Sequence, residues 1–205
     1  MMAWIPHALH FLANCIREPL EYPFILRNAV SPEFLEYVTK VTLQNEEQFK
    51  KNAAGAQRKF MTMDYVTPEG DQVLFEMKQK LAKHYDLGDY RVPPNLKDFI
   101  GYITEGGSIH PHTDPDLPGQ RHVRINVLLK QPRGCIPLLE GMPISVAEGD
   151  AWLNLASQCV HATTPVEEPG CRSALSFGYQ IARSRGDELY EIHKEWMAKV
   201  RETVQ

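Results

Sequence analysis

Residues 122–130 read HVRINVLLK, a run in which two kinds of side chain alternate along the chain. Val123 and Ile125 fall on one side of an extended strand, whereas Arg124 and Asn126 fall on the other. This alternation is typical of a strand that packs one face on an apolar core. Its polar face, which includes an arginine, meets either solvent or a cavity.

A second strand with the same pattern is predicted over residues 171–181, which read CRSALSFGYQI. Leu175 and Phe177 share an apolar face, while Arg172 and Ser176 share the face of small and polar residues. On pattern alone, solvent explains such a face as well as a cavity inside a barrel does. The motif described below favours the cavity.

Short strand-like runs separated by Gly, Pro and Asp turns fill the whole region from residue 96 to residue 181. The predicted strands cover residues 96–103, 122–130, 143–147, 150–155 and 171–181. Many short strands beside flanking helices indicate an α+β or mainly β fold, a sandwich or a small barrel. The double-stranded β-helix, a jelly roll of the cupin-like kind, is one such fold.

Helices are predicted on both sides of this core, within a helical N-terminal part over residues 1–90 and a C-terminal helix over 187–204. One helix begins at Ser31-Pro32, a cap followed by proline, and a second begins near Asp71. The last follows Gly186-Asp187. No linker divides the chain, so we expect one domain over 1–205 with its β core at 96–181.

Composition excludes several classes of protein. The chain has 205 residues, 43% hydrophobic and 23% charged, and a formal charge of −4 with no basic run among aromatics, so we expect no nucleic-acid partner. Its four cysteines form no CxxC pair, which favours free thiols in the cytoplasm over a zinc site.

Residues 1–24 have no basic start and no apolar stretch long enough for a bilayer. We expect them to pack as a helix or strap, with no membrane partner. Oligomeric state stays open.

Residues 105–114 read EGGSIHPHTD and carry the candidate metal ligands. His112 and Asp114 form an H-x-D pair, and a third ligand must come from a distant strand. His161, 47 residues after Asp114, is the candidate, whereas His110 and His122 are expected in loops or at a strand edge. Two histidines and one carboxylate on one face of a metal leave three positions open, which suits non-haem Fe(II).

Arg172 follows His161 by eleven residues, at a position on the polar face of its strand. A guanidinium can hold a carboxylate through two hydrogen bonds. A dicarboxylate that chelates iron through its 2-oxo acid end would place its far carboxylate at Arg172.

With these residues, the region 96–181 resembles the Fe(II)/2-oxoglutarate-dependent dioxygenase superfamily. Within it, the region looks most like the aspartyl/asparaginyl β-hydroxylase-like group. The stretches that carry this resemblance are 105–107, 111–113, 124–126, 134–135 and 148–152, together with His161 and Arg172. Asn126 departs from that group, which typically has histidine there, and Asp114 supplies an acid that its well-known members lack. A prolyl-hydroxylase-like pattern is the second choice, on Tyr102 before the glycine pair and on the H-x-D.

The resemblance implies a site and a reaction. It implies Fe(II) on His112, Asp114 and His161, with 2-oxoglutarate and O2 as cosubstrates. Arg172, Tyr102, Arg124 and Asn126 are then candidates for binding 2-oxoglutarate. Tyr102 is expected either to pack or to contact the cosubstrate carboxylate, and Arg124 either to meet solvent or to contact a carboxylate of substrate or cosubstrate.

The implied activity is hydroxylation of an unactivated C–H with release of succinate and CO2. Retention of Asp114 favours hydroxylation over halogenation, because related halogenases replace that acid. The expected substrate is an amino-acid side chain, free, in a peptide or in a natural-product precursor. Two alternatives stay open: a non-catalytic jelly-roll protein that binds a small carboxylate, and a cupin-like metalloenzyme that does not use 2-oxoglutarate.

Overall fold

The computed structural model describes residues 21–92 and 97–204. The predicted N-terminal helix or strap lies outside these residues, apart from its last few positions. The elements in chain order are β1 (Ile25–Leu26), α2 (Pro32–Gln44), the 3-10 turn η1 (Glu46–Gln48), β2 (Lys50–Lys51), β3 (Gly55–Thr62), α3 (Gln72–His84), β4 (Tyr90–Arg91), β5 (Phe99–Ile109), β6 (Gln120–Lys130), β7 (Pro137–Leu139), β8 (Met142–Pro143), β9 (Ala151–Asn154), β10 (His161–Thr163), β11 (Cys171–Ala182) and α4 (Arg183–Val204). None of the helices in these residues is long and apolar enough to span a bilayer.

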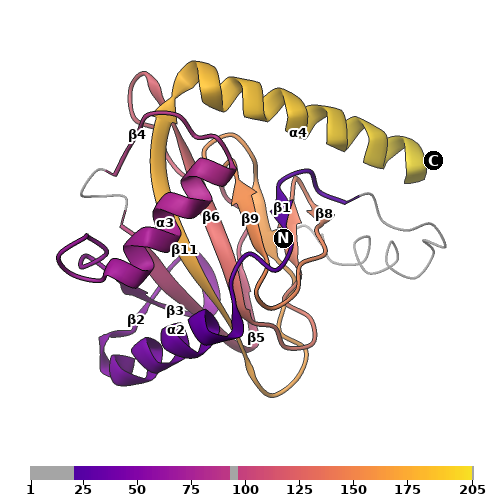
Figure 1. Cartoon of the computed structure of the whole chain (residues 1–205). Helices are drawn as coiled ribbons and strands as arrows, with labels where there is room; N and C mark the ends of the chain where they lie inside the picture. The colour runs from indigo at the N-terminus through magenta and orange to yellow at the C-terminus, as the bar shows by residue number, and fades with distance from the viewer. Residues whose placement is uncertain (1–20, 93–96, 205) are drawn as a thin grey trace.

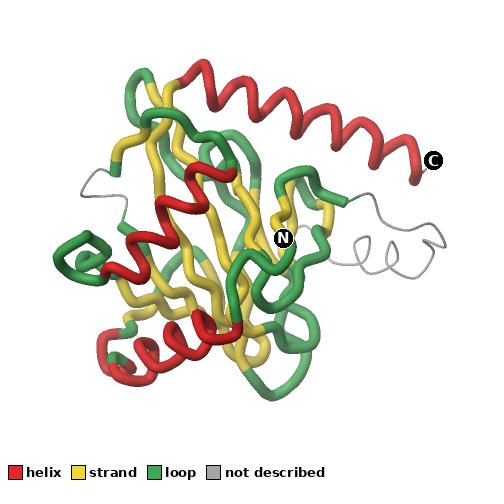
Figure 2. The backbone as a smooth tube through the Cα atoms, in the orientation of Figure 1, coloured by secondary structure: helices red, strands yellow, loops and turns green. Residues whose placement is uncertain are grey.

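The strands form two antiparallel sheets (Figure 1). The larger sheet has the order β1-β9-β6-β11-β5-β3-β2, with β4 paired to β11, and the smaller has the order β10-β7-β8. Residues 21–92 and 97–204 therefore form a mostly antiparallel β structure with three α-helices. The tube in Figure 2 shows α2 and α3 lying across one face of the long strands.

The two alternating strands predicted from sequence pair with each other at the centre of the larger sheet. Ile125 lies opposite Phe177, and Arg124 lies opposite Gly178. Ile125 and Phe177 on the apolar face are fully buried. Tyr179 on the same face donates a hydrogen bond to the Lys78 carbonyl of α3 at 2.9 Å. The helices thus cover the apolar face, and the polar face is left for the other side of the sheet.

Two of the three helices begin where their capping residues predict. Ser31 accepts a hydrogen bond from the Phe34 amide, and Asp71 accepts one from the Leu74 amide. Each such cap contributes about 1 kcal/mol to helix stability. The third prediction was wrong at its start: α4 begins at Arg183, so Gly186 lies inside its first turn. A Cβ on Gly186 would come within 2.4 Å of the Arg121 side chain, so glycine is needed here for packing and does not mark the start of the helix.

The strand predictions need three corrections. β5 starts at Phe99 and continues to Ile109, through the glycine pair that looked like a turn, because Gly106 takes a φ of +71° and lets the strand bulge. Only Met142–Pro143 is extended where residues 143–147 were expected. Six strands were not predicted at all: β1, β2, β3, β4, β7 and β10.

A buried ion pair joins α3 to the sheet. The Lys78 ammonium lies 2.7 Å from an Asp98 carboxylate oxygen, and both side chains are almost fully buried. Asp98 also accepts a hydrogen bond from the Gly178 amide at 3.0 Å. Burial lowers the pKa of Lys78 and raises the pKa of Asp98, while each charge opposes the shift in its partner. The Lys78 ammonium therefore compensates the buried Asp98 carboxylate.

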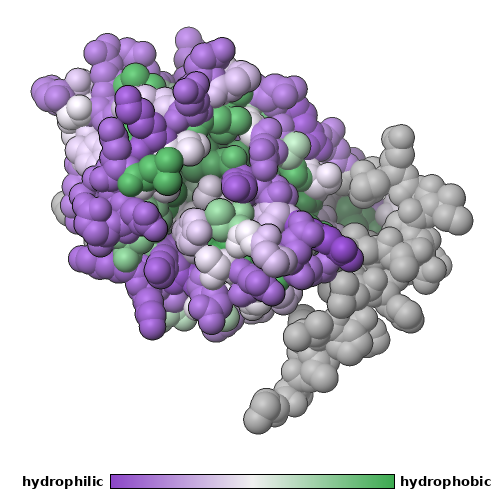
Figure 3. Space-filling model, turned by 90° about the horizontal axis from the view of Figure 1, so that it is seen from below, coloured by the Kyte–Doolittle hydropathy of each residue, from purple (hydrophilic) through white to green (hydrophobic). Residues whose placement is uncertain are grey.

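The surface is of mixed polarity. The face shown in Figure 3 has hydrophilic side chains over most of its rim and hydrophobic ones nearer its middle. The large hydrophobic residues that are clearly exposed in the described chain lie on separate elements: Leu43, Val73, Val92, Val160 and Ile192. Isolated apolar side chains of this kind are ordinary on a protein surface.

Candidate metal and cosubstrate site

His112 and His161 are brought together by the backbone. They form an isolated antiparallel bridge in which the His112 amide donates to the His161 carbonyl at 3.2 Å and the His161 amide donates back at 2.9 Å. Their ring centroids are 4.3 Å apart. The ladder continues with the Asp114 amide, which donates to the Ala156 carbonyl at 2.8 Å. Two segments far apart in sequence are thereby fixed side by side.

Both histidines have one ring nitrogen occupied in the same way. Nδ1 of His112 lies 2.7 Å from the His110 carbonyl, and Nδ1 of His161 lies 3.2 Å from the Cys159 carbonyl. A carbonyl can only accept, so each Nδ1 carries the proton and each Nε2 keeps a free lone pair. A backbone partner of this kind is what orients a metal-binding histidine.

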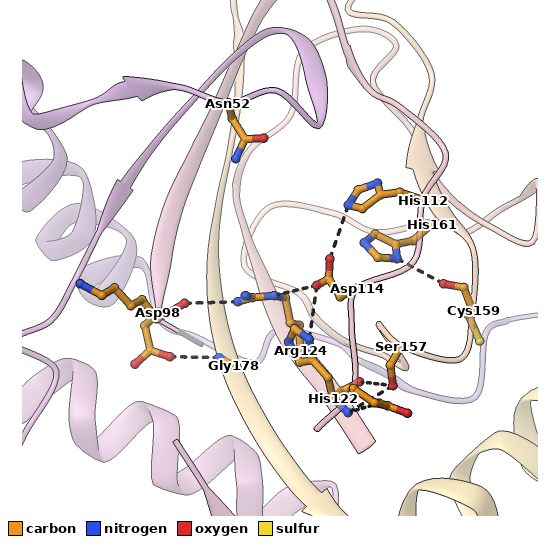
Figure 4. A network of polar contacts seen from close by, with 12 residues as sticks. Asn52, Asp98, His112, Asp114, His122, Arg124, Ser157, Cys159, His161 and Gly178 are labelled. Atoms are coloured by element: carbon orange, nitrogen blue, oxygen red, sulfur yellow. Dashed lines mark hydrogen bonds and ion pairs between the residues drawn. The ribbon is translucent and has the colours of Figure 1, made fainter. Parts of the chain in front are cut away.

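Asp114 completes the group (Figure 4). Ligand atoms of His112, Asp114 and His161 all lie within 4.8 Å of one another, close enough to share one metal ion. One Asp114 oxygen is 3.6 Å from His112 Nε2, and the other accepts a hydrogen bond from Arg124 Nε at 3.3 Å. The structure therefore places all three predicted ligands together.

The charge states suit a metal. Burial on its own would raise the pKa of Asp114, but Arg124 and the adjacent histidines keep that pKa below its usual value. Burial, followed by the proximity of His112, lowers the pKa of His161 to about 4. At neutral pH, Asp114 is therefore an anion and His161 is neutral, the forms that coordinate a cation.

His122 lies beside the three candidate ligands and is not one of them. It was expected in a loop or at a strand edge, but it is buried in β6, with Nδ1 3.6 Å from an Asp114 oxygen. Burial, followed by the charge of Arg124, lowers the pKa of His122 to about 4. A neutral His122 can therefore orient Asp114 without adding charge.

The ligands open onto a cavity of about 210 Å³ between the polar face of the larger sheet and the smaller sheet. Arg124 and Asn126 of β6 line it, as do Arg172 and Ser176 of β11. Of the two explanations of the polar faces, the cavity is therefore correct. Six of the seven predicted metal-binding or cosubstrate-binding residues, all except Tyr102, therefore line one cavity.

Arg172 is buried in the lining of this cavity and has no charged partner among the described residues. Its side chain is buried, its guanidinium carbon lies 5.7 Å from the Trp152 ring centroid, and its Nε has no hydrogen-bond partner in the described chain. The Asn154 side-chain oxygen and the Ser176 hydroxyl, which also line the cavity, likewise have none there. Unpartnered buried polar groups cost free energy, so this cluster fits a polar ligand that supplies the missing partners.

Tyr102 does not reach the cavity. Its neighbours Gly101 and Ile103 line it, so Tyr102 points to the opposite face of β5, where its ring contacts Phe49 at 6.2 Å between centroids. This position fits the alternative that Tyr102 packs, and it gives no support to the predicted contact with the cosubstrate. The reason is strand parity: Tyr102 is one residue out of phase with the cavity-lining positions.

Two cavity residues were missed in the sequence. Arg58 of β3 and Asn52 of the β2–β3 hairpin both line the cavity, and Asn52 points into it in Figure 4. Neither belongs to a motif. Arg58 stands in the run Arg58-Lys59, which reads as solvated charge, and β3 was not predicted as a strand.

Known proteins resemble this chain in structure. The viral collagen prolyl hydroxylase of Paramecium bursaria Chlorella virus 1, in complex with 2-oxoglutarate, matches 77% of this chain and 95% of its own length, with a TM-score of 0.59 and 12% identity. A Pseudomonas putida prolyl-4-hydroxylase matches 78% and 91%, with a TM-score of 0.56 and 12% identity. The chain has the fold of the prolyl hydroxylases.

A third similar structure is HygX from Streptomyces hygroscopicus with nickel, 2-oxoglutarate and hygromycin B bound. It matches 76% of this chain and 81% of its own, with a TM-score of 0.55 and 14% identity. No protein-family model matches the sequence, and no curated protein is similar enough in sequence to count as a relative. These comparisons support the prolyl-hydroxylase-like resemblance and do not confirm the aspartyl/asparaginyl β-hydroxylase-like one.

Three largely buried histidines predict how stability depends on pH. The pKa of His122, His161 and His193 is lowered from 6.5 to about 4, chiefly by burial. Below pH 6.5 these histidines bind protons in the unfolded chain, whereas in the folded chain they stay neutral down to about pH 4. The free energy of unfolding of the metal-free protein should therefore fall as pH falls, by up to about 1.4 kcal/mol per pH unit for each histidine.

Urea unfolding at pH 7, 6 and 5 measures this dependence. His193 is remote from the cavity lining, so His193→Phe isolates its share and should flatten the slope between pH 6 and 5 by about 1.4 kcal/mol per pH unit. An unchanged slope in His193→Phe would contradict the pKa assigned to this residue.

Proposed function

We propose that this protein is an Fe(II)- and 2-oxoglutarate-dependent dioxygenase that hydroxylates an unactivated C–H. One observation carries the proposal: the three ligand side chains and Arg172, a buried arginine without an acidic partner, open onto the same cavity. The substrate class we propose is an amino-acid side chain, free, in a peptide or in a natural-product precursor. The prolyl-hydroxylase fold supports a substrate of this kind.

The residues fit the metal that this chemistry requires. His112 and His161 would bind Fe(II) through Nε2, and Asp114 through its carboxylate, which leaves the other coordination positions to ligands from solution. When bound, Fe(II), 2-oxoglutarate and O2 together supply the oxidising chemistry, in which 2-oxoglutarate is converted to succinate and CO2.

The remaining side chains bind and orient. We infer that Arg172 holds the far carboxylate of 2-oxoglutarate, with Ser176 as a hydrogen-bonding neighbour, because both are buried and lack partners in the described chain. Arg124 donates to one Asp114 oxygen and so leaves the other oxygen free for the metal. Asn126 lines the same cavity and is a candidate for contact with either cosubstrate or substrate.

We infer further that the two sheets are the halves of a double-stranded β-helix. The position of the cavity between the sheets and the antiparallel pairing of both support this interpretation. In this proposal, residues 1–205 act as one dioxygenase domain of the cytoplasm, with a small-molecule or peptide substrate and without a nucleic-acid or membrane partner.

The proposal is tested by incubating the purified protein with Fe(II), 2-oxoglutarate and O2, together with a broad panel of amino acids and peptides, and measuring succinate. We expect succinate to form, to stop when iron is chelated, and to return when Fe(II) is added but not when Zn(II) is added. If iron-loaded protein does not bind 2-oxoglutarate at all, the proposal is wrong. Binding without succinate across the whole panel would favour a non-catalytic carboxylate-binding protein, and activity without 2-oxoglutarate would favour a cupin-like metalloenzyme.

A further inference from the structure

The cavity holds more positive charge than the cosubstrate can use. Arg58, Arg124 and Arg172 all line it, and Asp114 is the one acidic residue among its described lining residues. Asp98, a buried acid outside the cavity lining, is already paired with Lys78. Fe(II) and 2-oxoglutarate carry equal and opposite charges, so their binding leaves the excess of arginine unchanged.

Arg58 is the arginine without an assigned partner. Arg172 is deep in the cavity, and Arg124 donates to Asp114. In the described chain Arg58 forms no ion pair, and its one recorded hydrogen bond, to the side-chain oxygen of Asn52, is long at 3.4 Å. Its guanidinium is therefore available to another acceptor.

Arg58 and Arg124 also lie near one aromatic ring. The guanidinium carbon of Arg124 is 4.8 Å from the Phe99 ring centroid, and that of Arg58 is 5.9 Å from it. Two like charges near one ring repel each other. Burial, followed by the charges of Arg172 and Arg124, lowers the pKa of Arg58 to about 10. An anion bound at Arg58 would offset this repulsion.

We propose that Arg58, with Arg124 beside it, binds an anionic group of the substrate, so that the enzyme accepts substrates with a free carboxylate or a similar oxyanion. This proposal rests on the proposed function, because it takes Arg172 as the residue that binds 2-oxoglutarate. A planar carboxylate matches the two parallel N–H groups of a guanidinium, and a tetrahedral phosphate can use the same donors. Asn52 supplies a further polar group at the same wall of the cavity.

The test measures binding and does not depend on turnover. Protein loaded with Mn(II) is first titrated with 2-oxoglutarate by calorimetry, and the saturated complex is then titrated with two matched panels. One panel holds N-acetyl-L-amino acids, and the other holds the same compounds as neutral primary amides. Inorganic phosphate forms a third arm, which separates a tetrahedral oxyanion from a carboxylate.

We expect at least one acid, or phosphate, to bind about 10-fold or more tightly than the neutral amides, as the loss of a charge-assisted hydrogen-bond pair implies. Arg58→Gln should remove this preference and leave the dissociation constant of 2-oxoglutarate within about 2-fold, while Arg58→Lys should keep part of the preference. Lys59→Gln is the matched control, because Lys59 is the adjacent cation, is exposed and does not line the cavity.

Three results would overturn the proposal. The amides could bind as tightly as the acids, no anion could bind at all, or Arg58→Gln could weaken 2-oxoglutarate binding by about 10-fold, as expected for a cosubstrate residue. If the wild-type protein does not bind 2-oxoglutarate, that separate result counts against the proposed function. Anion titrations of the Mn(II)-loaded protein without 2-oxoglutarate then still decide whether Arg58 binds an anion. Thermal unfolding of each variant confirms that it is folded.

Discussion

Replacing His112 or His161 by alanine is expected to abolish iron-dependent succinate formation and to weaken divalent-metal binding by more than about 100-fold, beyond what loss of an outer-shell partner costs. Each histidine presents a free Nε2 to the same point, and two ligands alone hold a divalent ion weakly. Titration of the metal-free protein with Mn(II), followed by a succinate assay with Fe(II), measures both effects.

His110→Ala is the matched control for this prediction. His110 is exposed, and it contributes to the site through its backbone carbonyl, which the substitution keeps. Metal affinity should therefore stay close to that of the wild type. If His110→Ala weakened metal binding as much as His112→Ala, the assignment of the ligands would be wrong.

Arg172→Gln is expected to raise the KM for 2-oxoglutarate while metal affinity stays nearly constant. The substitution leaves a carboxylate buried opposite a neutral amide, which costs about 2–4 kcal/mol, or roughly 30- to 1000-fold in binding. Arg172→Lys keeps the charge but loses the second hydrogen bond, so we expect an intermediate KM. Calorimetric titration of the Mn(II)-loaded variants with 2-oxoglutarate measures the binding step directly.

Arg133→Gln controls for the loss of positive charge in general, since Arg133 is 74% exposed and remote from the cavity lining. Its KM for 2-oxoglutarate should match that of the wild type. An unchanged KM in Arg172→Gln, together with a large increase in Arg124→Gln, would move the cosubstrate carboxylate to Arg124.

Much of the site could be predicted because it lies on strands with strong alternation. In β6 and β11 the apolar and polar positions differ clearly, so the side of the sheet that faces the cavity follows from the sequence. His112 and Asp114 are two residues apart, so their proximity could be predicted from local geometry alone. The assignment of His161 required a long-range assumption, and the backbone bridge places His161 beside His112.

The side of the sheet on which Tyr102 lies could not be predicted, because its strand gives no such contrast. Residues 99–103 read FIGYI, so both faces of this part of β5 are apolar and parity cannot be assigned from the sequence. The structure resolves it, with Phe99, Gly101 and Ile103 toward the cavity.

Arg58 could not be found for a different reason. β3 reads GAQRKFMT, with few β-branched residues, and its register on β5 shifts between Ala56 and Arg58. Gln57 takes a φ of +48° at this shift, a local irregularity that no alternation pattern predicts. The residue that we assign to substrate binding therefore depends on long-range pairing of strands and on a bulge.

The central claim is that one metal on His112, Asp114 and His161 and one 2-oxoglutarate on Arg172 occupy the same cavity. An anaerobic crystal structure of the protein with Mn(II) and 2-oxoglutarate tests it most directly. We predict Mn(II) bound to Nε2 of both histidines and to the Asp114 carboxylate, with the far carboxylate of 2-oxoglutarate paired to Arg172. A metal bound elsewhere, or a cavity that holds the metal without 2-oxoglutarate, would contradict the account.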